Sequence, residues 1–435
     1  MNERLIILET LLLIEKGEDY GSRIIKDVLD KYAYLSRQHR SFIKRVLEGT
    51  LERKIELDYI INQFSKTPTA SMKPVILCIL RMSVYQLKYM DQVPESAVCN
   101  EAVKLAEKKG FFKLKGFVNG VLRNIARNLV NIKYPDISIT YSVPDFLYEH
   151  FKKYYGDNAE QICASFLRDN ITTIRPNLSK TTLNKLTEAL KEDGASLTPI
   201  PDIPDIPSAK SPKAYLLSDY NLLSDLKAFR DGLFIVQDQS AMLPVELAPI
   251  KAGDTVIDVC AAPGGKTIQI IDKLCQLGGG NIYSFDISEY KTDIINENLE
   301  RCDFGEANES VKVKVDVCDA TEFHEDYVNQ ADVLIADLPC SGLGIIGRKS
   351  DIKYNVTQES MESLVMLQRE ILCNVVKYVK DGGTLMYSTC TLNPEENENQ
   401  VKWMEESFSL KCEEMYQIFP SEYRDGFFAA RMVKQ

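Results

Sequence analysis

The amino-acid sequence predicts a multidomain protein: an all-α N-terminal part, a small α+β module in the middle and a C-terminal α/β domain. Three observations predict this. With 435 residues, the chain is too long for one hydrophobic core. Apolar residues follow helical spacing throughout residues 1–130. From about Gly232, strand-like and helical runs alternate, which is typical of a mostly parallel sheet with helices on both faces.

The N-terminal 130 residues show no strand pattern, and Pro74 and Pro94 lie where helices are expected to begin. They carry 22 Lys and Arg against 15 Asp and Glu, a net charge of +7. The whole chain carries −11, so the remainder carries −18. This asymmetry favours a domain that docks on phosphate, although a solvated helical surface that happens to be basic explains it equally well.

Three segments of this part resemble the RNA-binding antitermination factor NusB. They read SFIKRVLEGTLERKIELDYI at 41–60, LRMSVYQLKYMDQVPESAVCNEAVKLA at 80–106 and GFVNGVLRNI at 116–125. The resemblance implies a helical domain over residues 1–135 that contacts RNA. The alternative is a helical bundle that serves only as a spacer.

Residues 140–231 mix helical and extended patterns and predict the small α+β module. Ile171–Leu178 alternates like a strand. The run PIPDIPDIPSAKSP at Pro199–Pro212 predicts a surface loop. The function of this module cannot be inferred from its sequence.

Residues 232–435 form the predicted α/β domain, in which ligands bind beyond the carboxyl ends of the strands. Seven strands are expected: Thr255–Cys260, Ile282–Asp286, Val311–Val317, Val333–Asp337, Gly383–Cys390, Leu410–Met415 and Phe427–Val433. Candidate site residues should therefore directly follow these runs.

The first strand ends in DVCAAPGGKT, whose glycines permit close approach of a ligand and whose following helix directs free N–H groups towards it. The run matches neither GxGxxG nor a P-loop. We expect it to bind a nucleoside cofactor through Cys260, Ala261, Ala262, Pro263, Gly264, Gly265 and Lys266.

Two aspartates follow the next strands. Asp286 is suited to the hydroxyls of a ribose. Asp319 is suited to an adenine amino group, with Asp316 as a near competitor. The alternative for each is a helix cap or turn residue.

Asp337 and Cys340 follow the fourth strand, and Cys390 ends the fifth. If these strands are neighbours, the three side chains surround one pocket beside the cofactor, where a thiol nucleophile and an acid can act together. Asn393, Pro394 and Glu396 predict a helix start with a capping box. A single cysteine in such a place is otherwise a buried apolar residue.

The motifs DVCAAPGGKT, ADLPCSG and YSTCTLNPEENE resemble those of the RNA cytosine-C5 methyltransferases. GLFIVQDQSAM at 232–242 and DGFFAARMVK at 425–434 also match that family. The resemblance implies a Rossmann-like domain that binds S-adenosyl-L-methionine through these motifs and Asp337. It makes Cys390 the nucleophile and Cys340 the residue that assists product release. DNA cytosine methylases use the PC-motif cysteine instead, and the residues alone leave open which thiol attacks.

This assignment suits the chemistry, because carbon 5 of cytosine becomes nucleophilic only after a thiolate adds to carbon 6. A carboxyl group such as Asp337 stabilises the charge near N3. The target base must be unpaired or flipped out of a helix.

The segment Gly347–Tyr354 resembles the R-x-x-D-I-K loop of the same family, with Arg-Lys-Ser in place of Arg-His-Pro. Its basic residues either position RNA phosphate or order the active site. A solvated surface loop is the alternative.

A NusB-like domain joined to this catalytic domain is the arrangement of the bacterial B-type 16S rRNA (cytosine-C5)-methyltransferases. The resemblance implies methylation of small-subunit rRNA. Methylation of tRNA or another rRNA site is the first alternative, and a non-catalytic RNA-binding factor is the second. An amino-group methylase is disfavoured because Asp-Leu-Pro-Cys replaces its Asp/Asn-Pro-Pro-aromatic turn.

Composition sets the remaining expectations. No apolar run reaches about 18 residues, and the apolar N-terminus lacks a basic region and a cleavage site. We therefore expect a cytoplasmic protein without a signal peptide or a membrane partner. The eleven cysteines form no CxxC pair and the three histidines are far apart, so no metal site is predicted. We expect a monomer.

Overall fold

The computed structural model describes residues 2–17, 20–303 and 310–435, which form two compact units. Unit 1 comprises residues 1–168 together with 346–355, and unit 2 comprises residues 169–345 and 356–435. The domain boundaries predicted after residues 135 and 231 fall inside these units and stay predictions.

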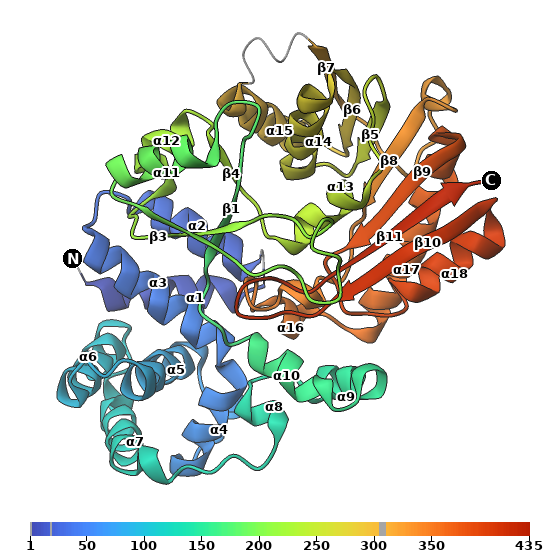
Figure 1. Ribbon diagram of the computed structural model, residues 1–435. Coiled ribbons are helices and arrows are strands. Elements are labelled where there is room, and N and C mark those ends of the chain that lie inside the picture. Colours follow the sequence, from blue (N-terminus) through green and yellow to red (C-terminus); the bar gives the residue numbers. More distant parts are fainter. Residues whose placement is uncertain (1, 18–19, 304–309) are drawn as a thin grey trace. The chain divides into compact units, whose positions relative to one another are not determined.

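Unit 1 is helical, as predicted (Figure 1). Pro74 is the first residue of α5, and Pro94 is the N-cap of α6, so both prolines lie where a missing N–H costs no hydrogen bond. Its helices are α1 Glu3–Ile14, α2 Gly21–Lys31, α3 Arg37–Glu52, α4 Lys54–Phe64, α5 Pro74–Tyr89, α6 Glu95–Lys108, α7 Lys115–Asn128, α8 Ile137–Thr140, α9 Asp145–Tyr155, α10 Asn158–Ser165 and α16 Ile352–Asn355.

Several cations of unit 1 are bound inside it. Arg81, 6% exposed, pairs with Asp58 at 2.6 Å and with Glu15 at 2.9 Å. Arg53 pairs with the buried Glu56 at 3.1 Å. The number of Lys and Arg residues in the sequence is therefore larger than the number of cations that this unit has available to contact phosphate.

Unit 2 begins with a four-stranded antiparallel sheet in the order β2-β3-β1-β4, which confirms the predicted α+β module. Its elements are β1 Thr172–Pro176, α11 Leu183–Glu192, β2 Ser196–Pro199, β3 Tyr215–Ser218, α12 Lys227–Arg230 and β4 Phe234–Val236. The proline-rich run is only partly the predicted surface loop. Ile203 and Ile206 are buried in the core beneath the larger sheet, because burial removes their apolar side chains from water.

The second sheet has seven strands in the order β10-β11-β9-β8-β5-β6-β7 (Figure 1). All strand pairs from β9 to β7 are parallel, and β10 and β11 add antiparallel pairs at one edge. This is the predicted mostly parallel, Rossmann-like sheet. Its strands are β5 Thr255–Val259, β6 Gly280–Asp286, β7 Val311–Val317, β8 Ala331–Asp337, β9 Val379–Thr389, β10 Leu410–Ile418 and β11 Phe427–Lys434.

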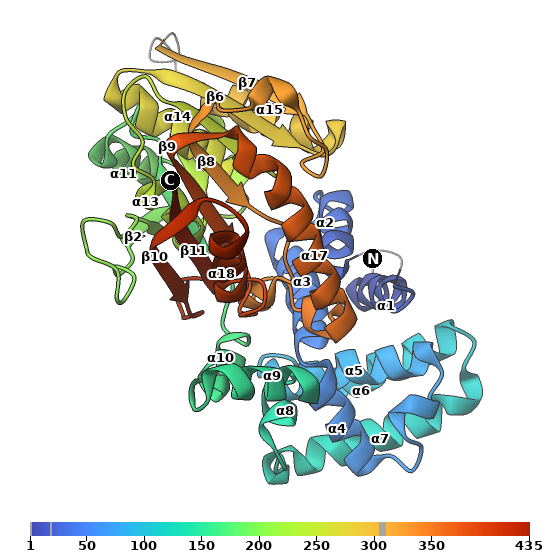
Figure 2. The same ribbon diagram turned by 90° about the vertical axis from the view of Figure 1, so that its right-hand side faces the viewer.

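Helices cover both faces of this sheet. Val256 of β5 points towards a core that includes α13 and α14, whereas its neighbour Ile257 points towards α17. In Figure 2, α17 and α18 lie together on one face. The covering helices are α13 Leu243–Leu247, α14 Gly265–Leu277, α15 Glu289–Cys302, α17 Gln358–Val375 and α18 Glu398–Ser407. Among the described residues, no helix is long and apolar enough to span a membrane.

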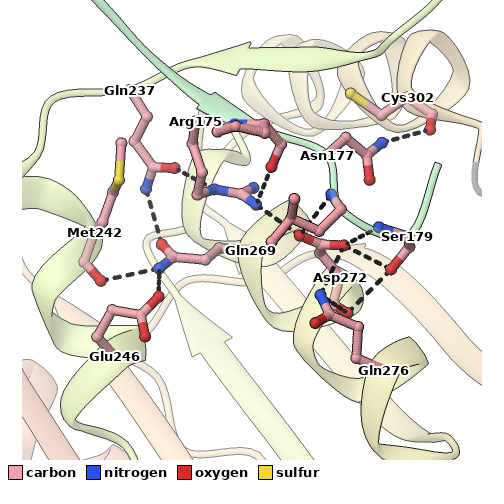
Figure 3. Close-up of polar contacts among 12 residues, drawn as sticks. Arg175, Asn177, Ser179, Gln237, Met242, Glu246, Gln269, Asp272, Gln276 and Cys302 are labelled. Carbon is pink, nitrogen blue, oxygen red and sulfur yellow. Dashed lines mark hydrogen bonds and ion pairs between the residues drawn. The ribbon is translucent and has the colours of Figure 1, made fainter. Parts of the chain in front are cut away.

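A buried ion pair fastens the small module to α14 within unit 2 (Figure 3). Arg175 of β1 donates to Asp272 of α14 at 3.0 Å, and Asp272 also accepts from Ser179 at 2.6 and 2.7 Å. The pair borders a cavity of about 440 Å³ on the α14 side of the module. Lys273, which also lines the cavity, donates to the carbonyls of Val245 and Ala248.

We expect Asp272→Ala to lower the free energy of unfolding by about 3–5 kcal/mol, because the guanidinium of Arg175 stays buried without its anion. Chemical denaturation measures the loss. Asp272→Asn is the matched control, since it keeps acceptors for Ser179 and should lose less. Equal stability of Asp272→Ala and the unaltered protein would contradict a fastening role.

Candidate active site

The carboxyl ends of β5, β6, β8 and β9 meet at one edge of the seven-stranded sheet. β8 pairs with β9, with Asp337 opposite Ser388, and β5 lies between β8 and β6. The two strand ends that carry Asp337 and Cys390 are therefore neighbours, as predicted.

The loop after β5 lies against the end of β6. The Ala261 amide donates to the Phe285 carbonyl, and the Ala262 amide donates to the carboxylate of Asp286, each at 2.9 Å. Gly264 has φ +95°, and a Cβ there would lie 3.2 Å from Ile295. The structure thus brings the predicted cofactor loop and Asp286 together, with glycine where the backbone requires it.

Asp286 and Asp319 differ in their surroundings. Asp286 is 3% exposed and also contacts Lys291 at 2.9 Å. Asp319 follows β7, and its carboxylate accepts from the Thr321 amide and hydroxyl, which lowers its pKa. Asp316 lies within β7 and accepts from Tyr327, so it is not beyond the strand end. Of these two competitors, only Asp319 lies beyond the strand end, and its bonds with Thr321 are also those of the turn residue that the sequence left as the alternative.

Lys266 forms an ion pair with Asp337 instead of standing free in the cofactor loop. Asp337 also accepts from the Ser388 hydroxyl at 2.9 Å. The carboxylate is therefore held in place by one residue of α14 and one of β9, next to the loop that carries Cys340.

Cys340 and Cys390 face each other with their sulfurs 3.3 Å apart. The hydrogen bond with Cys390, and then burial, raise the pKa of the Cys340 thiol well above its ordinary value. Both side chains are partly exposed. The Gly344 amide donates to the Cys390 carbonyl at 3.0 Å, so the turn after Cys340 is tied to the strand end that carries Cys390.

The predicted helix start at Pro394 is wrong, because α18 begins at Glu398. Glu396 does not cap that helix. Its buried carboxylate accepts from the Ser341 amide at 2.9 Å, the Asn393 amide group at 2.9 Å and Gln368 at 3.1 Å. These donors draw residues 394–397 into a turn that supports the Cys340 loop.

Glu396 and Asp258 border the predicted site residues, a position that sequence reasoning did not predict for either. Asp258 lies in β5, is 1% exposed and accepts from the Thr267 hydroxyl at 2.7 Å. Burial raises its pKa to about 7. The signal for Asp258 was a charged residue inside an otherwise apolar strand.

We expect Asp258 to make stability fall as pH rises. Its pKa in the folded protein, about 7, exceeds the ordinary value of 3.8. Between these values the unfolded chain loses the proton while the folded protein keeps it, so the folded state is progressively penalised. Asp258→Asn should therefore gain stability relative to the unaltered protein between pH 4 and pH 7, measured by urea unfolding across that range. A constant difference would contradict the raised pKa.

Family models match three consecutive parts of the chain. One described as 16S rRNA methyltransferase RsmB/F matches residues 245–433. One described as the NusB family matches residues 1–127. A third, the ferredoxin-like domain of RsmF/B-like methyltransferases, matches residues 143–206.

Curated relatives match nearly the whole chain. The probable ribosomal RNA small subunit methyltransferase B of Bacillus subtilis is 32% identical over 404 residues, covering 91% of this chain and 86% of that relative. The protein of the same description from Synechocystis is 30% identical over 448 residues, covering 97% of each chain.

Two solved structures share the fold. PH0851 matches with a TM-score of 0.79 and 22% identity, covering 99% of both chains. NSun6 from Pyrococcus horikoshii, solved with SFG, matches with a TM-score of 0.55 and 24% identity, covering 67% of this chain and 98% of that one.

Proposed function

Because this chain belongs to the RsmB/F family of 16S rRNA methyltransferases, we propose that it transfers a methyl group from S-adenosyl-L-methionine to carbon 5 of a cytosine in small-subunit rRNA. The observation that carries the proposal is the pair of thiols 3.3 Å apart at the ends of β8 and β9, beside Asp337. A methyltransferase that modifies an amino group needs no such pair.

Residues already in place fit the cofactor. The loop Cys260–Gly265 offers backbone at the start of α14, which suits an anionic carboxylate. Asp286, at the end of β6, has the position and chemistry to accept from ribose hydroxyls, and Asp319 to accept from an adenine amino group. When bound, S-adenosyl-L-methionine supplies a methyl group on a positively charged sulfur.

The Cys390 thiolate adds to carbon 6 of the cytosine, and Asp337 acts as the acid that delivers a proton to N3 as negative charge develops there; the proton returns when the carbon–sulfur bond breaks. Carbon 5, now nucleophilic, would take the methyl group as the methyl–sulfur bond of the cofactor breaks and its sulfur becomes a neutral thioether. A base then removes the proton on carbon 5, the carbon–sulfur bond breaks, and the ring regains its double bond while Cys390 leaves as a thiolate. The family resemblance of the TC motif assigns attack to Cys390, and Cys340 lies 3.3 Å from it, within reach of the same ring.

We propose that the NusB-like part contacts the RNA. The net positive charge of residues 1–130 and the match of residues 1–127 to the NusB family support this. Arg81 and Arg53 form ion pairs within the unit, so we expect other cations to contact the RNA.

Bisulfite sequencing of rRNA from cells with and without the gene tests the proposal. We expect one cytosine signal in small-subunit rRNA to disappear with the gene. Loss of a tRNA signal or of another rRNA signal instead would assign a different substrate to the same chemistry. If no RNA loses a mark, the non-catalytic RNA-binding alternative replaces the proposal.

A further inference from the structure

Residues 346–355, here called the inserted segment, belong to unit 1, although the chain on both sides of them belongs to unit 2. The polypeptide leaves unit 2 after Ile345, five residues beyond Cys340, and returns at Val356. The segment contains the R-x-x-D-I-K motif, whose role the sequence left open.

Asp351 anchors the segment at the start of α2. It is 6% exposed, and its carboxylate accepts from the Gly21 amide at 2.8 Å. The first amides of a helix need acceptors, and Tyr20, the N-cap of α2, supplies no side-chain cap. Asp351 therefore provides both the missing cap and a negative charge at the positive end of the helix.

Lys353 anchors the segment at the end of α3. Its side chain is fully buried, and its ammonium group donates to the carbonyl of Glu52, the last residue of α3, at 2.7 Å. Burial lowers its pKa to about 7, and either protonation state keeps an N–H for this bond. A buried Lys353 cannot contact RNA phosphate, so the ordering role is the one that fits it.

Tyr354 completes the anchor. Its hydroxyl lies 3.3 Å from both the Glu52 carbonyl and the Ser142 hydroxyl. Ser142 in turn accepts from the Ile55 amide at 2.9 Å, at the start of α4. The inserted segment thus contacts the ends of three helices of unit 1 through side chains.

The other end of the connection is fixed in unit 2. The Gly344 amide donates to the Cys390 carbonyl, and the Gly344 carbonyl accepts from the Gly426 amide at 2.9 Å. A Cβ on Gly344 would lie 2.2 Å from the Gly426 oxygen, so the close packing of these two backbones leaves no room for a side chain at Gly344. Two residues later the chain enters unit 1.

We infer that Asp351 and Lys353 are positioning residues for the methyl transfer: they tether the turn that carries Cys340 to the helical unit through the continuous chain. The inference rests on the proposed function. According to this inference, the helical unit contributes to the rate of methyl transfer as well as to RNA binding. Asp351 and Lys353 then act on the Cys340 turn and do not contact RNA.

The test compares Asp351→Ala and Lys353→Met with Asp351→Asn in the full-length protein. Asn keeps an acceptor for the Gly21 amide, whereas Ala and Met remove an anchor. We expect Asp351→Ala and Lys353→Met to lower the single-turnover rate by about 10- to 100-fold at saturating rRNA and S-adenosyl-L-methionine, as small misplacements of reacting groups do. Both Kd values should stay within about threefold, and Asp351→Asn should keep a near-normal rate.

Three results would overturn the inference: an unchanged rate in both anchor variants, a loss confined to RNA affinity, or a defect in Asp351→Asn equal to that in Asp351→Ala. The last would show that the charge itself acts, not the bond to Gly21. Amide hydrogen exchange separates this inference from the proposed function. Asp351→Ala should speed exchange at residues 341–345 in the absence of RNA, and unchanged exchange there counts against the tether even if no methylation is detected.

Tyr354→Phe is a milder variant that still tests the inference if Asp351→Ala or Lys353→Met fails to fold. It removes only the hydroxyl, whose contacts include Glu52 and Ser142. We expect a few-fold lower single-turnover rate with faster exchange at 341–345. If the anchor variants fail to fold and Tyr354→Phe changes neither quantity, the inference is wrong.

Discussion

Cys390→Ala is expected to reduce methyl transfer by on the order of 10⁴-fold or more, because removal of a covalent nucleophile leaves only binding and orientation to lower the barrier. Carbon 5 of cytosine does not attack the methyl donor until a thiolate has added to carbon 6. Affinity for S-adenosyl-L-methionine should change less than about twofold, since Cys390 bonds to Gly344 only through its backbone carbonyl, which alanine keeps. Transfer of a radioactive methyl group to rRNA and calorimetric titration of the cofactor measure the two quantities.

Cys373→Ala is the matched control, since Cys373 is an exposed cysteine of α17 outside the site. It should retain full activity. Substantial methylation by Cys390→Ala would remove Cys390 from the nucleophile's role. A comparable loss in Cys373→Ala would show that replacing any cysteine lowers the measured activity, so the loss in Cys390→Ala would not be specific.

The sequence predicted the elements of the large sheet well because hydrophobic runs determine them locally. The expected Val311–Val317 coincides with β7, and the expected Val333–Asp337 lies within β8, which begins two residues earlier. Placement of Asp337, Cys340 and Cys390 around one point also followed, since parallel strands align their carboxyl ends.

Contacts between distant parts of the chain account for what the sequence did not predict. Glu396 resembled the third residue of a capping box, but its carboxylate binds Ser341, 55 residues away. For Lys353 the sequence left three roles open, namely contact with RNA phosphate, ordering of the active site and a place in a solvated loop. The structure buries it against Glu52, 301 residues away. Neither partner could be predicted from local sequence, because each is supplied by another element of the fold.

The contact between Cys340 and Cys390 matters after methyl transfer as well as before it. Their sulfurs lie 3.3 Å apart, and either can donate the hydrogen bond between them. Once the Cys390 sulfur is bonded to carbon 6, it is a thioether and has no proton to share. Cys340 is then the neighbouring group placed to act as a base when the carbon 5 proton must leave.

Cys340→Ala is therefore expected to stop the reaction after methyl transfer, with the RNA still bonded to Cys390. Without the base, the proton stays on carbon 5 and the carbon–sulfur bond cannot break, so the covalent complex accumulates to roughly one per enzyme. A denaturing gel of enzyme incubated with rRNA and S-adenosyl-L-methionine should show a band of protein–RNA complex that Cys340→Ala/Cys390→Ala lacks. If Cys390→Ala forms the stable complex and Cys340→Ala does not, the two thiols have exchanged roles.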